Sequence, residues 1–249
     1  MRDLTPNRRL MRSNFPDLDR TPSDQKLGRP QPPLETPVPE GAEKFGLPPL
    51  DPTVVVEPDV YACLRRRRSR RSWADGSLTI PQLSFLLWAT QGVQRVFGRG
   101  YSTFRPVPSG GARHPFETYL AVQRVQGVEP GIHRYLPLTH ELTVVRRTPD
   151  LAQPITDATL GQDFVGAAPV VFFWTCIPYR GEWRYDTAAH KIMLIDAGHL
   201  CQNLYLACEA LGCGTCAVAA YDQRQVDALL GVDGEEEFVV YLAPVGRAR

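Results

Sequence analysis

The sequence lacks any long hydrophobic run. No stretch reaches the roughly 18 consecutive apolar residues that a membrane-spanning helix needs, and the basic N-terminal segment is not followed by the apolar region of a secretory signal. We therefore expect no membrane partner and a cytoplasmic location, where thiols stay reduced. The six cysteines are accordingly expected to be mostly free, five of them serving as small apolar residues inside hydrophobic runs.

The chain also lacks an excess of charge of either sign. Its 28 Lys and Arg residues face 27 Asp and Glu residues, for a formal net charge of +1. Such a balance provides no global attraction to nucleic acid or to an anionic membrane. With 43 % hydrophobic and 22 % charged residues, the composition is that of a globular protein. A length of 249 residues suits one large domain.

Several catalytic motifs are absent. The sequence contains no GxSxG elbow of a hydrolase, no GxxxxGK[ST] phosphate loop and no GxGxxG dinucleotide motif. Cys213 and Cys216 form a CxxC pair, but no second CxxC or HxxxH supplies the other two zinc ligands. The pair also follows a helix instead of starting one, which disfavours a thioredoxin-like role. We predict no metal site, and we interpret residues 212–222 as a small-residue strand that can lie against a flat ligand.

Residues 1–57 differ from the remainder of the chain. They are rich in proline and show no sustained helical or alternating pattern. Such a segment cannot build its own core, so we predict an extended N-terminal arm over residues 1–57. One folded domain is predicted over residues 58–249.

The patterns in the domain predict both helices and strands. Helices are predicted at 58–68, after the Thr79/Gln82 capping box, at 188–211 and at 223–230, with Gly212 ending the longest one. Strands are predicted at 117–125, 141–147, 169–177 and 238–244. No regular βαβ alternation is present, so the predicted fold class is α+β with a long central helix.

An arginine run at residues 65–71 is the most unusual local feature. A solvated basic turn explains it, and so does a nucleic-acid patch. A third interpretation is a phosphate site, because guanidinium groups bind phosphate in a bidentate manner and Ser69 adds a neutral donor.

Two further segments contain candidate site residues. In the turn Pro108–Pro115, adjacent glycines allow close approach of a ligand, and Ser109 and Arg113 supply donors; an ordinary loop is the alternative. Asp196 and His199 lie on one face of the long helix, where a packing hydrogen bond explains them. Residues 183–186 are predicted to form a polar loop that either transfers a proton through Tyr185 or caps a pocket.

In chain order, six segments resemble the nitroreductase family, and in particular its SagB/ThcOx branch of FMN-dependent dehydrogenases. They are Ser23-Asp24-Gln25 with Gly28-x-Pro30-x-Pro32-Pro33, Arg67-Arg68-Ser69-x-Arg71-x-Trp73, Leu86–Val93, Pro108–Pro115, Gly127–Tyr135 and Ala197–Leu204. The resemblance implies an FMN fold with a mixed or antiparallel sheet flanked by helices. It also implies a homodimer in which the long helix lies at the interface and each of two FMN sites is built from both chains.

The same resemblance implies the roles of individual residues. The FMN phosphate and ribityl chain would contact the arginine segment and Arg247, and the flavin would contact the Pro108 turn and the backbone near Ala219. The cofactor-binding residues implied in this way are Arg67, Arg68, Ser69, Arg71, Pro108, Ser109, Gly110, Arg113, Ala219, Ala220 and Arg247.

The predicted catalytic residues are Tyr185 and Arg184. They occupy the place of a Lys-Tyr pair in the azoline oxidases of the branch, with Asp186 in place of the following glycine. Since arginine stays protonated, only Tyr185 is left to transfer a proton. The predicted function is dehydrogenation of a peptide or natural-product intermediate, such as azoline to azole, by hydride transfer to flavin N5. The alternatives are an NAD(P)H-dependent nitro or quinone reductase and a non-enzymatic module that binds nucleic acid through Arg65–Arg71.

Overall fold

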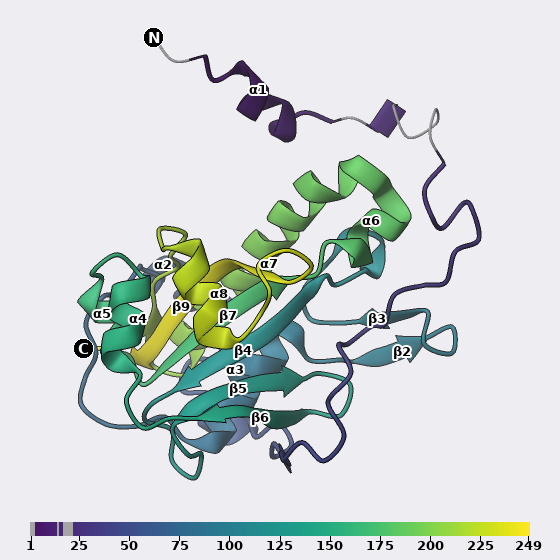
Figure 1. Ribbon diagram of the computed structural model, residues 1–249. Helices are drawn as coiled ribbons and strands as arrows, with labels where there is room; N and C mark the ends of the chain where they lie inside the picture. The colour runs from purple at the N-terminus through teal and green to yellow at the C-terminus, as the bar shows by residue number, and fades with distance from the viewer. Residues whose placement is uncertain (1–2, 14, 17–21) are drawn as a thin grey trace.

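A seven-stranded antiparallel sheet forms the centre of the chain (Figure 1). The computed structural model describes residues 3–13, 15–16 and 22–249. The strand order is β1-β6-β5-β4-β7-β9-β8, and the hairpin β2–β3 lies outside this sheet. The strands are β1 (Lys44–Gly46), β2 (Arg95–Phe97), β3 (Ser102–Phe104), β4 (Phe116–Val122), β5 (Gly131–Leu136), β6 (Glu141–Arg147), β7 (Val170–Cys176), β8 (Cys213–Thr215) and β9 (Phe238–Arg247).

Two hydrophobic cores lie on opposite faces of the sheet. Strand β7 shows why, because successive side chains of a strand point to opposite faces. Phe172 and Trp174 pack in one core, whereas Val171 and Phe173 pack in the other, and all four are fully buried. A strand buried on both faces reads as a continuous apolar run, which is what made residues 169–177 predictable.

Helices cover both faces. Residues of α3 and α7 contribute to the first core, and residues of α4 and α8 contribute to the second. The predicted capping box at Thr79 and Gln82 is present at the start of α3. The helices are α1 (Thr5–Arg8), α2 (Val60–Arg66), α3 (Ile80–Gln91), α4 (Ala152–Ala158), α5 (Asp163–Gly166), α6 (Tyr179–Tyr185), α7 (Ala189–Ala210) and α8 (Gln223–Leu230).

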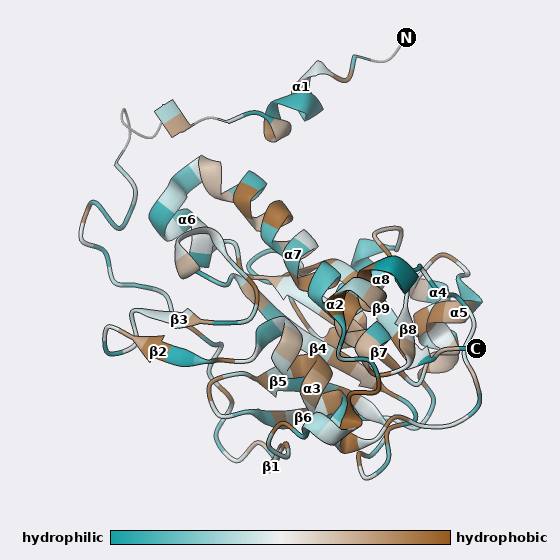
Figure 2. Cartoon of the chain, turned by 180° about the vertical axis from the view of Figure 1, so that it is seen from behind, coloured by the Kyte–Doolittle hydropathy of each residue, from teal (hydrophilic) through white to brown (hydrophobic). Residues whose placement is uncertain are grey.

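Helix α7 is the long central helix that the sequence predicts. Its 22 residues span about 33 Å, and Gly212 follows it with a φ of +66°, as expected of a glycine that ends a helix. The first turns of α7, together with α6, project beyond the sheet in both views (Figures 1 and 2). Leu194 and Ile195 on this part of α7 are 51 % and 49 % exposed.

The loop predicted at residues 183–186 was wrong. Residues up to Tyr185 belong to α6, and Asp186, with a φ of +47°, ends that helix. A seven-residue helix offers too few turns to display a hydrophobic period. Strand β5 and helices α4 and α5 were not predicted either, whereas the α+β class and the antiparallel sheet are confirmed.

The described part of the arm bonds to the domain at several points. Strand β1 pairs with β6 and extends the sheet. The Thr36 N–H donates to Glu117 Oε1 over 2.8 Å, and Arg180 of α6 donates to the same oxygen over 2.5 Å. Arg134 of β5 donates to the Thr36 carbonyl over 2.9 Å. Thr36 and residues 44–46 are therefore held on the sheet, while the boundary at residue 57 stays a prediction.

Candidate functional site

The arginine segment runs along one edge of the sheet. Ser69 forms a parallel bridge with Thr215 of β8, and the Arg70 N–H donates to the Thr215 carbonyl over 2.9 Å. A side chain at Gly214 would collide with the stem of Arg70, and one at Gly246 would meet the Trp73 ring at 2.9 Å. These glycines therefore serve close packing within the chain, and they explain why small residues surround this edge.

The guanidinium groups of this segment divide into paired and unpaired ones. Arg70 forms an ion pair with Glu209 of α7 at 3.1 Å. Arg67, Arg68, Arg71 and Arg247 form no ion pair with any residue that the structure describes, and the last three are exposed. The Arg67 guanidinium lies over the Tyr205 ring of α7, and the Arg71 guanidinium lies over the Phe164 ring of α5. Unpaired guanidinium groups along one segment are suited to bind an anion.

The same edge receives the segment that follows β8. Ala219 and Ala220 are exposed beside it, and the Val218–Leu242 bridge holds their segment on β9. We call this group the basic edge; it consists of Arg67, Arg68, Ser69, Arg71, Ala219, Ala220 and Arg247.

Two buried polar atoms at the basic edge test whether a ligand fits there. Arg70 Nε and Thr215 Oγ1 have no hydrogen-bond partner within the described residues. Buried polar groups are normally satisfied, so these atoms and the unpaired arginines together suit a ligand with a phosphate and hydroxyl groups. A phosphorylated, polyhydroxylated cofactor such as FMN meets this requirement.

The turn predicted to contact the flavin lies against α7. Ser109 donates to Asp196 Oδ2 over 2.7 Å, and the Gly110 N–H donates to the same oxygen over 3.1 Å. Burial raises the pKa of Asp196, although these two donors oppose the shift. His199 Nδ1 lies 3.9 Å from Asp196 and has no hydrogen-bond partner in the described chain. Asp196 thus holds the turn in place.

The glycine pair in this turn is explained by packing. A side chain at Gly110 would collide with Ile192 of α7, and one at Gly111 would lie 2.6 Å from the Tyr185 hydroxyl. Gly111 also has a φ of +59°, which favours glycine. Within one chain, Ile192 of α7 and Tyr185 of α6 therefore fill the space beside these two glycines, where the sequence predicts a ligand.

Arg113 lies inside the protein. It is 4 % exposed, and its guanidinium lies 4.9 Å from the ring centroid of Tyr101 and 5.4 Å from that of Trp183. It donates to the carbonyls of Gly111 and Tyr101, and burial lowers its pKa. These contacts stabilise the turn. Pro108, at the start of the turn, is exposed. Flavin contact by either residue stays a prediction.

Tyr185 and Arg184 lie next to this turn. The Arg184 guanidinium lies 5.4 Å from the Tyr185 ring centroid and donates to the Tyr101 hydroxyl over 2.9 Å. Gln25 of the arm donates to the same hydroxyl over 2.7 Å. We call Ser109–Arg113 with Arg184 and Tyr185 the turn group. Tyr101 and Gln25 were missed by sequence reasoning, because only the fold brings them here.

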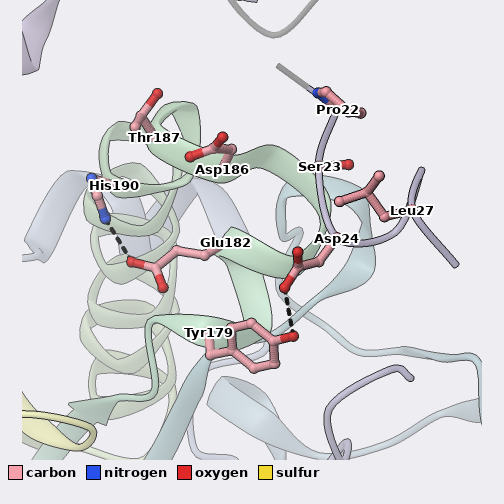
Figure 3. Close-up of a pocket in the computed structure, with 9 residues that line it drawn as sticks. All are labelled: Pro22, Ser23, Asp24, Leu27, Tyr179, Glu182, Asp186, Thr187 and His190. Carbon is pink, nitrogen blue, oxygen red and sulfur yellow. Dashed lines mark hydrogen bonds and ion pairs between the residues drawn. The ribbon is translucent and has the colours of Figure 1, made fainter. Parts of the chain in front are cut away.

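A cavity of about 390 Å³ lies beside the turn group, between the arm and the helices α6 and α7 (Figure 3). Asp24 of the arm accepts a hydrogen bond from Tyr179 over 2.8 Å, and His190 pairs with Glu182 at 2.7 Å. Figure 3 shows that arm and helices both line the cavity, so the arm shapes the surroundings of α6.

The turn group and the basic edge are well separated within one chain. Asp196 holds the first group and Tyr205, through Ser69, contacts the second. Asp196 and Tyr205 are nine positions apart on α7, which corresponds to about 13 Å along the helix. The predicted cofactor residues therefore lie in two groups, each of which contacts α7 at a different place.

No group of three or more His, Cys, Asp or Glu residues suited to a metal ion exists among the described residues. Cys213 and Cys216 are buried free thiols, as are the other four cysteines. No helix in the described part of the chain is long and apolar enough to cross a membrane.

The antiparallel α+β core carries unpaired arginines at one sheet edge, which suits a phosphate-bearing ligand. The profile of the nitroreductase family matches residues 64–247, and the chain belongs to this family. It is therefore an oxidoreductase, and its cofactor is FMN, on which members of the family depend. The predictions of family, enzyme class and cofactor are confirmed.

Three relatives carry more specific names. The protein named "Putative nitroreductase MJ1384" of Methanocaldococcus jannaschii is 33 % identical over 184 residues, which cover 74 % of this chain and 88 % of the relative. The trifolitoxin-processing protein TfxB of Rhizobium leguminosarum is 28 % identical, over 55 % of this chain and 38 % of the relative. The microcin B17-processing protein McbC of Escherichia coli is 24 % identical, over 53 % of this chain and 50 % of the relative.

Solved structures share the fold. A structure from Ralstonia eutropha, described as a putative nitroreductase, has a TM-score of 0.67 and 27 % identity, and the match covers 88 % of this chain and 99 % of that one. One with the same description from Anabaena variabilis has a TM-score of 0.70 and 26 % identity, covering 84 % of this chain but only 42 % of that one. A chain in the E. coli microcin synthetase McbBCD complex matches in fold, with a TM-score of 0.62 and 16 % identity, over 98 % of this chain and 91 % of that one.

Proposed function

We propose that this nitroreductase-family oxidoreductase dehydrogenates a peptide or natural-product intermediate, with azoline-to-azole oxidation as the type reaction. The observation that carries the proposal is its similarity to two proteins named for processing trifolitoxin and microcin B17. The fold match to the microcin synthetase complex also extends over nearly the whole chain, arm included.

The basic edge is proposed to hold the phosphate and ribityl chain of FMN. Arg67, Arg68, Arg71 and Arg247 supply unpaired guanidinium groups, and Ser69 supplies a hydroxyl. The exposed backbone at residues 219–220 would lie along the flavin ring. Bound FMN supplies a two-electron acceptor at N5, and the protein determines position, electrostatics and access.

We infer that the active protein is a homodimer. The turn group and the basic edge lie about 13 Å apart along α7, so a single chain presents two incomplete half-sites. Leu194 and Ile195 are apolar and half exposed on the projecting part of the same helix, where a second copy would bury them. In a dimer, the turn group of one chain would complete the basic edge of its partner. The expected mass in solution is twice the 27.8 kDa of one chain.

Oxidation of an azoline removes a proton in addition to the hydride. We assign the proton transfer to Tyr185, because Arg184 beside it stays protonated and cannot accept a proton. Arg184 donates to Tyr101 and Gln25 and lies against the Tyr185 ring, so it serves to orient the tyrosine. Ser109 donates its only proton to Asp196, accepts from the His114 N–H, and so shapes the turn.

A reductase that consumes NAD(P)H and a nitro or quinone compound is the second candidate. The 33 % sequence identity to the Methanocaldococcus protein, which is named as a putative nitroreductase, favours this candidate. The test mixes FMN-loaded protein, without oxygen, either with NADH and NADPH or with an azoline-containing peptide, and follows bleaching of the flavin absorbance. Bleaching by the peptide alone supports the dehydrogenase. Bleaching by a pyridine nucleotide, followed by reoxidation with a nitroaromatic, would replace it with the reductase.

A further inference from the structure

Tyr205 lies where the basic edge meets α7. It is 9 % exposed and packs in the core that contains residues of α3 and α7. The Arg67 guanidinium carbon lies 5.2 Å from its ring centroid, and Ser69 Oγ lies 2.9 Å from its hydroxyl. The Ala217 N–H donates to the same hydroxyl over 2.9 Å. One side chain therefore contacts two residues of the basic edge, Arg67 and Ser69, and the start of the segment that leads to Ala219.

The hydrogen bond between the Tyr205 and Ser69 hydroxyls can run in either direction. A phenol has a single proton, and its oxygen already accepts from Ala217. If Tyr205 donates that proton to Ser69, the Ser69 hydroxyl keeps its own proton for another acceptor. If Ser69 donates to Tyr205, it can offer only lone pairs. A phosphate dianion accepts hydrogen bonds and does not donate them, so it selects the first arrangement.

The ring of Tyr205 acts on Arg67. A guanidinium donates its hydrogen bonds within its own plane, and contact of its face with an aromatic ring leaves the N–H edge free. Arg67 has no carboxylate partner in the described chain and is only partly exposed. The ring thus keeps this arginine extended toward the place where Ser69 presents its proton.

We propose that Tyr205 is a positioning residue for the FMN phosphate. Its ring contacts Arg67, and its hydroxyl donates to Ser69, so that Ser69 can donate its own proton to the phosphate. The same hydroxyl accepts from the Ala217 N–H at the start of the 217–220 segment. The inference rests on the proposed location of the phosphate at the basic edge.

Two substitutions separate the ring from the hydroxyl. Tyr205→Phe keeps the ring, and Tyr205→Leu removes both groups. The dissociation constants of FMN and riboflavin are measured with the apoprotein by flavin fluorescence. A hydrogen-bond chain to a charged group predicts that FMN binds about 10- to 100-fold more weakly to Tyr205→Phe. Riboflavin has no phosphate, so its dissociation constant should change less than about threefold. Tyr205→Leu should bind FMN more weakly still.

A matched control and a double variant complete the test. The control is Tyr135→Phe on β5, which removes another buried tyrosine hydroxyl. That hydroxyl bonds to His140 over 2.7 Å, and its loss should leave FMN affinity unchanged. Because the hydroxyl of Tyr205 acts through Ser69, the Tyr205→Phe/Ser69→Ala double variant should stay within about threefold of the weaker single variant.

The outcomes distinguish this role from the location of the site. Unchanged FMN affinity in Tyr205→Phe, equal losses for FMN and riboflavin, or fully multiplicative losses in the double variant would overturn the role of Tyr205. Parent-like FMN affinity in an Arg67→Ala/Arg71→Ala variant would instead show that the phosphate binds elsewhere. Loss of FMN in that arginine variant with no effect of Tyr205→Phe would refute the tyrosine inference alone.

Discussion

The buried ion pair between Arg180 and Glu117 provides a sharp test of how the arm is held. The two side chains are 4 % and 2 % exposed and lie 2.5 Å apart. Glu117 also accepts from the Thr36 N–H. Glu117→Gln would leave Arg180 charged in a buried place without its partner. Removing one partner of a buried pair costs about 3–5 kcal/mol, and for a protein of this length each kcal/mol lowers Tm by about 2–4 °C. We therefore expect Tm to fall by about 6–20 °C.

Thermal unfolding followed by circular dichroism measures this effect. Glu43→Gln is the matched control, because its partner Arg147 is half exposed, and surface pairs contribute little. A Glu117→Leu/Arg180→Met double variant should lose less than the sum of the single substitutions, since it leaves no unpaired charge. A Glu117→Gln protein that melts within about 2 °C of the parent, or strictly additive losses, would refute the reasoning.

Three further predictions concern the site and the pH dependence of stability. Arg67→Ala/Arg71→Ala should give folded protein with little FMN after purification, measured as the ratio of flavin absorbance to protein; full flavin content would contradict the phosphate site. Tyr185→Phe should retain FMN yet slow substrate oxidation in stopped-flow mixing, and an unchanged rate would remove this residue from the mechanism. Burial lowers the pKa of His114 to about 3, below its ordinary value of about 6.5. The stability linked to neutral His114 is therefore complete above pH 6.5 and is lost as the pH falls toward 3, by up to about 5 kcal/mol. His114→Asn should flatten this part of the curve of unfolding free energy against pH, and an unaltered curve would show that His114 is not its source.

Local signals made much of the fold predictable. The Thr79/Gln82 capping box, the glycine after the long helix and the apolar run of β7 each depend on neighbours in sequence. Strand β5 carries His133 and Arg134 in a fully buried strand, so its polar residues concealed it. The partner of Arg134 is the Thr36 carbonyl, which lies 98 residues away in sequence and is brought there by the fold.

The site was predictable only in part. The arginine segment could be recognised from its composition, and it lies beside β8, the strand that pairs with Arg247 of β9. Tyr205 could not be recognised, because it lies 136 residues from Ser69 in sequence and resembles an ordinary core tyrosine. The need for glycine at positions 110 and 111 could not be predicted either, because Ile192 and Tyr185, which pack against them, lie far away in sequence.

The pairing of β1 with β6 has a consequence for shortened forms of the protein. A strand at the margin of a sheet offers unsatisfied N–H and C=O groups, on which another chain can add a strand. Here β1 occupies the margin at β6, and the Ser69 bridge partly shields the opposite margin at β8. A chain beginning after residue 46 would keep every predicted FMN contact but would leave β6 open. Such a truncated enzyme is expected to self-associate strand to strand and precipitate, so the arm protects solubility as well as shaping the site.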